Sequence, residues 1–183
     1  MSRARDLANL GDGITGADLP AGSVLQVVSA TKTDTFSQGQ SPNSISGTDV
    51  PGLTPAITPS STSSKILVTV HLNVGHSSPT QVSDQDKGFV LHRNGSPIAI
   101  GDAAGSRSRI TTMQNHTNQS GFSHMAMTFL DEPSTTSSVT YSVRCFQGAG
   151  STENIYVNMD YSNGDASYTA RGVSTLTLME IAG

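Results

Sequence analysis

Apolar and polar residues alternate with a period of two through most of the chain after Gly22. In the clearest segment, residues 65–74, every second side chain is apolar and would face a core, namely Ile66, Val68, Val70, Leu72 and Val74. This period is typical of a half-buried β-strand. The same pattern predicts further strands over residues 89–101, 122–130, 139–146, 154–159 and 173–181.

Four segments modify this picture. Asn94-Gly95, in the middle of residues 89–101, predicts a tight hairpin, since both residues tolerate the positive φ that such turns require. Residues 23–30 are almost continuously apolar, which favours a strand buried on both faces. Prolines leave residues 50–59 at best an edge strand. Residues 36–49 have no apolar period, so we expect a loop there.

The order of these elements predicts the fold class. Eight or more strands separated by Ser, Thr, Gly and Asp turns, with no convincing helix after residue 21, indicate an all-β protein. Strands at this spacing are typical of a β-sandwich, and a jelly roll is the arrangement we expect. The sequence thus divides into an extended N-terminal arm, residues 1–21, and a jelly-roll β-sandwich domain, residues 22–183.

The arm has a composition of its own. Residues 3–10 could form two helical turns with Leu7 and Leu10 on one face. The Gly- and Pro-rich residues 11–22 then exclude a stable helix. Arg3 and Arg5 suit docking into an acidic or amide-lined groove of another subunit, because arginine presents a planar fork of donors. A solvated terminus is the alternative. We expect docking, with these two arginines and two leucines as the binding residues.

Composition and charge narrow the classes of function. The 183 residues are 34% hydrophobic and 13% charged, with a net charge of −4. Phosphate binding needs an excess of Lys and Arg, so we expect no nucleic-acid partner. The single cysteine, Cys145, excludes an intramolecular disulfide, and its place on the apolar face of a strand indicates an inert core residue.

The sequence shows neither a membrane-spanning segment nor a secretory signal. No apolar run approaches the roughly 20 residues that a membrane span needs. The first residues lack the apolar stretch of a secretory signal. We therefore expect no membrane partner and synthesis without export.

Five sequence blocks carry a resemblance to a known group of proteins. They are GSVLQVVSATKTDTFS, TPSSTSSKILVTVHLNVG, LHRNGSPIAIGDAAG, FLDEPSTTSSVTYSVR and RGVSTLTLMEI. Together they span residues 22–181 and resemble small virion proteins of tailed bacteriophages, common in aquatic and cyanobacterial phages. The resemblance implies a homotrimeric jelly roll that serves as a capsid decoration (cement) protein or as a tail-fibre module. It brings no catalytic residues with it.

The resemblance also implies a place and partners. Such a protein is assembled in the host cytoplasm and lies on the capsid exterior or on the tail of the virion. Its partners are copies of itself and the major capsid protein or another virion subunit. Residues 36–49, 76–88 and 111–121 do not belong to the familiar blocks, so we expect ligand or partner specificity to differ there.

Candidate chemistry is sparse. The spacing of the five histidines supplies no set of three convergent metal ligands; they are His71, His76, His92, His116 and His124. His71 would point away from the core, and we expect it at a subunit contact. Residues 84–88 imitate the start of a calcium loop but lack its later acidic ligands, so we expect a solvated turn. Asp131-Glu132 precede Pro133 and are interpreted as a turn, not as the carboxylate pair of a glycosidase.

Two classes of function stay open. We predict no catalytic residue, no metal site and no cofactor, and hence a structural protein that is not an enzyme. Residues 23–30 and 173–181 are apolar on both faces, which favours a trimer that covers the surplus apolar surface. The alternative is a receptor-binding tip whose loops recognise a host surface glycan. The chain is 5% aromatic without tryptophan, and the cluster to test is Tyr156, Tyr161 and Tyr168.

Overall fold

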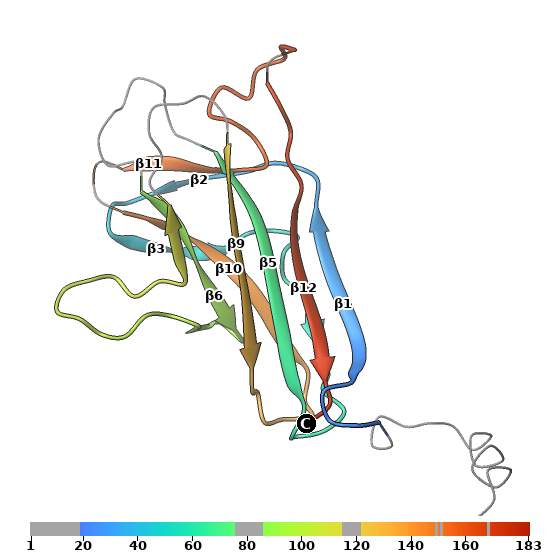
Figure 1. Cartoon of the computed structure of the whole chain (residues 1–183). Coiled ribbons are helices and arrows are strands. Elements are labelled where there is room, and N and C mark those ends of the chain that lie inside the picture. The colour runs from blue at the N-terminus through green and yellow to red at the C-terminus, as the bar shows by residue number, and fades with distance from the viewer. Residues whose placement is uncertain (1–18, 76–85, 115–121, 149, 151, 168) are drawn as a thin grey trace, which may run out of the picture.

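Two antiparallel sheets face each other in the computed structural model, which describes residues 19–75, 86–114, 122–148, 150, 152–167 and 169–183 (Figure 1). The first sheet contains β1 (Val24–Lys32), β2 (Phe36–Gln40), β5 (Lys65–Gly75), β9 (Phe122–Asp131), β11 (Glu153–Val157) and β12 (Ser174–Ile181). The second sheet contains β3 (Ser44–Asp49), β4 (Ala56–Ile57), β6 (Lys87–Arg93), β7 (Ser96–Ile98), β8 (Thr112–Gln114) and β10 (Val139–Gln147). No helix occurs among the described residues.

The strand order is that of a jelly roll. The central strands follow the order β1-β12-β5-β9 in the first sheet and β3-β10-β6-β8 in the second. Taken in chain order, these eight strands alternate between the two sheets at each step except from β6 to β8, which pair with each other. Two sheets wound in this way from Greek-key connections form a jelly-roll sandwich. The predicted fold class is confirmed.

Inward-facing positions of both sheets form one apolar core. All five predicted core residues of residues 65–74 are fully buried on β5. The same holds for the predicted inward residues of β10 and β11, which are Val139, Tyr141, Val143, Cys145, Ile155 and Val157. Each fully buried aliphatic side chain contributes roughly 2 kcal/mol by leaving water. The period-two alternation therefore predicts the core correctly in these strands.

The hairpin and the edge strand also match the sequence. Arg93 pairs with Ser96 across the turn between β6 and β7, and the two turn residues have positive φ, 49° at Asn94 and 79° at Gly95. These angles are those of the tight turn that Asn-Gly favours. Residues 50–59 contribute the two-residue strand β4, which pairs with one end of β10.

Two predictions about the first 49 residues are wrong. Residues 36–49 form β2 and β3 and not a loop, because their backbones pair with β11 and β10. Backbone pairing does not require an apolar period, so the sequence pattern gave no sign of it. Residues 23–30 are not buried on both faces: β1 is an edge strand whose Val28 and Ala30 are partly buried against the core, and its Val24 and Val27 are 52% and 56% exposed.

Asn158 fastens the end of the sandwich where β1, β11 and β12 meet. Its buried side-chain amide donates to the carbonyl oxygens of Lys32 (2.8 Å) and Asp34 (3.0 Å), and its carbonyl oxygen accepts from the Ser174 hydroxyl (2.7 Å). Its φ of 62° lies in the left-handed region, which asparagine tolerates better than most residues. One side chain thus fixes the bend through which the chain passes from β1 to β2.

The chain enters and leaves the sandwich at the opposite end. The Gly22 amide donates to the Ala182 carbonyl at 2.8 Å, and the Ala182 amide donates to the Ser23 carbonyl at 2.8 Å. Figure 1 shows the C-terminus beside the start of β1. The division into an arm and a domain at residue 22 stays a prediction, because residues 1–18 lie outside the described part of the chain.

Candidate functional site

The side of the first sheet that faces away from the core carries a row of apolar residues across four strands. We call this side of β1, β12, β5 and β9 the outer face. Strand register places Val27 opposite Met179, Met179 opposite Leu67, and Leu67 opposite Leu130. Val27 is 56% and Leu130 45% exposed. A contiguous apolar row on a surface is typical of a protein contact, whereas scattered apolar residues are ordinary.

A row of hydroxyl groups runs beside the apolar row on the outer face. Two residues further along β1, Ser29 is opposite Thr177 of β12. Thr177 is in turn opposite Thr69 of β5, and Thr69 is opposite Thr128 of β9. The Ser29 and Thr177 hydroxyls are 2.8 Å apart and hydrogen-bonded. Hydroxyl groups both donate and accept hydrogen bonds. The outer face therefore offers an apolar strip with polar groups along one border.

Two histidines meet on the outer face. His71 Nδ1 on β5 lies 3.1 Å from His124 Nε2 on β9, and the ring planes differ by 16°. In this contact one ring nitrogen donates an N–H and the other accepts it. The prediction that His71 points away from the core is confirmed, and its place at a subunit contact stays a prediction. The pairing of two histidines 53 residues apart was invisible in the sequence spacing.

The described histidines do not assemble a metal site. His92 is buried in the second sheet, where Nδ1 lies 3.1 Å from the Val90 carbonyl and burial lowers the pKa of the ring. His76 and His116 lie outside the described residues. Within the described ranges, no group of three or more His, Cys, Asp or Glu side chains could hold a metal ion.

Asp131 anchors a polar cluster inside one end of the sandwich. Its two carboxylate oxygens accept from one guanidinium nitrogen of Arg93, both at 2.9 Å, and one of them also accepts from the Tyr141 hydroxyl at 2.6 Å. Burial and this hydrogen bond raise the pKa of Tyr141. The interpretation of Asp131-Glu132 as a turn is wrong for Asp131, which is 6% exposed and ends β9. Glu132 is exposed and pairs with Lys65 at 2.7 Å.

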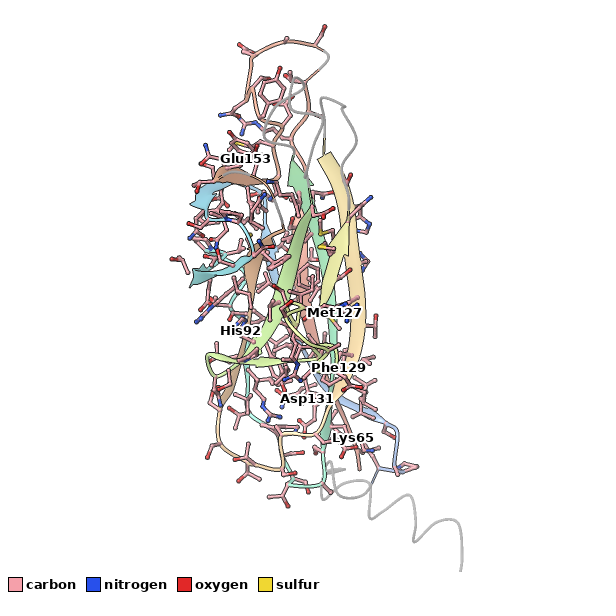
Figure 2. The ribbon with its side chains drawn as sticks, turned by 90° about the vertical axis from the view of Figure 1, so that its left-hand side faces the viewer. Lys65, His92, Met127, Phe129, Asp131 and Glu153 are labelled. Carbon is pink, nitrogen blue, oxygen red and sulfur yellow. The ribbon has the colours of Figure 1, made fainter. Side chains whose placement is uncertain are left out.

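A second polar cluster lies inside the other end. Lys87 on β6 is fully buried, donates to Gln147 Oε1 on β10, and lies 3.4 Å from Glu153 Oε2 on β11. Figure 2 shows Glu153 and Asp131 at opposite ends of the sandwich, with Met127 and Phe129 between them. The expected solvated turn over residues 84–88 is therefore wrong at Lys87, the first residue of β6.

The alternation of β6 contained the signal for this cluster. Residues 87, 89, 91 and 93 share one face of the strand, and Phe89 and Leu91 are apolar core residues. Extending the period backward by one step places Lys87 inside the core. The charge of the lysine and of the neighbouring acidic residues favours a turn. At this position the strand period, and not the local composition, predicts the burial of Lys87 correctly.

A cavity of about 280 Å³ lies in the segment that connects β11 to β12. Its lining is mostly polar and includes Asp160, Asn163, Asp165, Thr169 and Arg171. The Asp160 carboxylate already accepts hydrogen bonds from the backbone N–H of Asn163 at 2.8 Å and from the Ser162 hydroxyl at 3.0 Å. No aromatic ring is among the described residues of the lining, although Tyr161 is close in sequence.

Some of the remaining residues singled out in the sequence are described by the structure, and the others lie outside the described residues. Cys145 is buried in the core, and burial raises the pKa of its thiol to about 12, which leaves it unreactive. Tyr156 and Tyr161 are half-buried, whereas Tyr168 lies outside the described residues. The predicted docking residues Arg3, Arg5, Leu7 and Leu10 lie outside them too. The described part of the chain contains no helix that is long and apolar enough to cross a membrane.

Comparison with known proteins finds a distant likeness in structure. No protein-family model matches the chain, and no curated protein matches it. Among solved structures, the chain is similar to the crystal structure of the infectious bursal disease virus VP2 subviral particle, with 11% sequence identity and a TM-score of 0.39. The match covers 86% of this chain and 33% of that chain, so this chain spans about a third of the VP2 length. At this TM-score the likeness carries no inference about function.

Proposed function

We propose that this chain is a structural protein of a tailed-phage virion, a homotrimer that decorates the capsid and has no enzymatic activity. The observation that carries the proposal is the resemblance of five sequence blocks to small phage virion proteins. Large parts of these blocks coincide with the framework strands β1, β5, β6, β7, β10 and β12. A resemblance that lies in framework strands supports a shared architecture and a shared structural role.

The outer face supports the self-association part of the proposal. Its apolar row leaves Val27 and Leu130 about half exposed in the single chain. Burial of such a row removes about 25 cal/mol of unfavourable hydration per Å² of apolar surface. The adjacent hydroxyl row and the His71–His124 pair would supply the polar border of the contact. A second copy of this chain is the occupant that we assign to the outer face.

Light scattering tests the self-association. The wild-type chain should have about three times its single-chain mass of 19.0 kDa. Leu67→Asp places a charge in the middle of the apolar row and should yield the single-chain mass with an unchanged circular dichroism spectrum. Thr136→Asp, in an exposed bend between β9 and β10, is the matched control and should keep the trimer. A wild-type mass of 19.0 kDa would contradict the proposed trimer.

Attachment to the virion is proposed to depend on residues 1–21, with Arg3, Arg5, Leu7 and Leu10 binding the major capsid protein or another virion subunit. The chain that starts at Gly22 should keep its fold and oligomeric state and should fail to bind particles that lack the protein. Gold-labelled antibodies on intact virions should lie over the head. If the shortened chain binds such particles as tightly as the full chain, the arm is not the anchor.

The alternative, a tail-fibre or receptor-binding tip, has one observation in its favour. The cavity between β11 and β12 presents carboxylate, amide and guanidinium groups, which hydrogen-bond well to sugar hydroxyls. The described lining offers no ring for a sugar to stack on, so we favour the decoration role. Antibody labelling over the tail, with loss of cell binding in Asp165→Ala, would favour the tip instead.

A further inference from the structure

Three inward-facing polar side chains meet at the end of the sandwich away from the chain entry. Lys87 and Gln147 are directly opposite each other in the antiparallel pair β6–β10. Both are fully buried. Glu153 reaches the same point from β11, and its side chain is 10% exposed. An amine, a primary amide and a carboxyl group therefore share one enclosed space, and each comes from a different strand.

We propose that Lys87 and Gln147 react with each other to form an isopeptide bond, with Glu153 carrying the proton. The reaction needs no external enzyme, oxidant or cofactor, because nucleophile, electrophile and acid–base group belong to the folded chain. The product is a covalent cross-link between β6 and β10 inside the jelly roll. The proposal is independent of the proposed function, since it concerns a modification of the fold wherever the protein is located.

The nucleophile is an amine with poor compensation for a positive charge. Charge-assisted hydrogen bonds between ammonium and carboxylate are usually about 2.7–2.9 Å long, whereas Lys87 Nζ lies 3.4 Å from Glu153 Oε2. Burial lowers the pKa of Lys87, and the carboxylates of Glu153 and Asp86 offset this only in part. A larger fraction of the amine is therefore neutral than at the surface, and the neutral amine has the lone pair that attacks a carbonyl.

The electrophile is already in contact. Lys87 Nζ donates to Gln147 Oε1, so the amide carbon Cδ is one bond from the contacting atom. Fixing two reacting groups in this way replaces an encounter in solution by a step within one molecule, which is the largest advantage of intramolecular reactions. Complete burial of both residues also keeps out the water that would otherwise hydrate the amine and compete for the amide.

The step balances without a change of oxidation state. The Nζ lone pair forms a bond to Gln147 Cδ, and Glu153 takes a proton from Nζ. Glu153 then gives that proton to the amide nitrogen Nε2, and the Cδ–Nε2 bond breaks. One amine and one primary amide become one secondary amide and one molecule of ammonia, and the Glu153 carboxylate is restored. A carboxylate beside a nucleophile usually has this role: it first accepts a proton and then donates it.

Intact mass spectrometry of the purified full-length protein under denaturing conditions is the test. The cross-linked chain should be about 17 Da lighter than its sequence, the mass of one ammonia. Trypsin should fail to cut after Lys87, since it needs the free amine, and the digest should contain one branched peptide that joins Lys87 to Gln147. A wild-type chain with the full sequence mass and normal cleavage after Lys87 would overturn the proposal without any variant.

Variants separate this reaction from other losses of ammonia. Asn94-Gly95 can cyclise with the same loss of mass, so the branched peptide and the variants decide. Glu153→Gln keeps the shape of the side chain and removes the proton carrier, and Lys87→Met removes the nucleophile; both should have the full sequence mass. Glu132→Gln, which removes a surface carboxylate, is the matched control and should keep the loss. Survival of the cross-link in Glu153→Gln would overturn the role of Glu153.

Discussion

The two polar clusters inside the sandwich differ in how well their charges are matched. At the end where the chain enters, Asp131 receives hydrogen bonds of 2.9, 2.9 and 2.6 Å from Arg93 and Tyr141. The Arg93 side chain is 33% exposed, so water shares its charge. At the other end Lys87 is fully buried, and its carboxylate neighbour is 3.4 Å away. The Asp131 cluster is therefore a complete ion pair. In the Lys87 cluster the amine lacks a close carboxylate partner, so loss of its charge is easier than formation of an ion pair.

This difference separates a structural group from a reactive one. An ion pair with close contacts and partial access to water holds two sheets together and has no tendency to react. A buried amine beside an amide and a carboxyl lowers the cost of its burial by losing its charge, and the neutral form is a nucleophile. Both clusters contain one acid and one base, so composition alone does not distinguish them. Distance and exposure do.

Replacing Lys87 should have the largest effect on stability. The cross-link would join residues 60 positions apart, and constraining a loop of that size in the unfolded chain stabilises a protein by about 4 kcal/mol. Lys87→Met should lower the free energy of unfolding by about this amount in a urea titration. Without a cross-link the sign reverses, because replacing a buried charge with an apolar side chain of similar volume is neutral or stabilising.

Removing Asp131 should have the next largest effect. Asp131→Ala leaves the Arg93 guanidinium and the buried Tyr141 hydroxyl without their partner, which costs about 3 kcal/mol. Denaturant unfolding followed by circular dichroism measures the change. A loss well under 1 kcal/mol would mean that water replaces the carboxylate and that this cluster contributes little to stability.

Deleting a single hydroxyl tests the same cluster more gently. Tyr141→Phe removes one hydrogen bond to a charged group and leaves Arg93 paired with Asp131, so the expected loss is about 1.5 kcal/mol. The same unfolding measurement applies. A loss as large as that of Asp131→Ala would show that the hydroxyl, and not the ion pair, dominates this end of the sandwich.

A pH series sharpens the comparison at the other end. In Glu153→Gln the amine of Lys87 stays free, and burial lowers its pKa in the folded state. Between the folded and unfolded pKa values the unfolded chain binds more protons, so stability rises with pH up to the ordinary lysine pKa of about 10.4, by at most about 1.4 kcal/mol per pH unit. Below the pKa of Lys87 in the folded state, the amine is protonated in both states and this gain in stability is fully lost.

The double variant with Lys87→Met in the Glu153→Gln background is the control for that series. It should lack the rise, because it has no amine at this position to titrate. Comparison of the two curves isolates Lys87 from the other groups that titrate at alkaline pH. Identical curves would show that the folded chain does not perturb Lys87.

The smallest effect is expected at the surface. Glu132→Gln removes the partner of Lys65, but both side chains are well exposed and water solvates each of them. We expect no measurable change in the unfolding midpoint. A clear loss would mean that this pair is part of a larger network with the neighbouring Asp131.

The sequence predicted side-chain alternation well and predicted strand partners poorly. Period two identified the inward faces of β5, β10 and β11, because apolar residues report burial directly. It missed β2 and β3, whose existence depends on backbone hydrogen bonds to β11 and β10, far along the chain. Likewise the meeting of His71 with His124 depends on the register between β5 and β9. The meeting of Arg93 with Asp131 depends on how the two sheets pack against each other. The properties of single residues in the sequence do not indicate which distant side chains come into contact.

The hydrogen bonds that Ala182 makes with Gly22 and Ser23 have a consequence for how the chain could be reconnected. These residues mark the two ends of the sandwich strands, and the Gly22 nitrogen lies 2.8 Å from the Ala182 oxygen. Such neighbouring ends are typical of domains that tolerate circular permutation. A short linker could join them, and new termini could open in the exposed residues 101–109. The permuted chain would keep every strand pair of the jelly roll while its ends moved to a different side of the molecule.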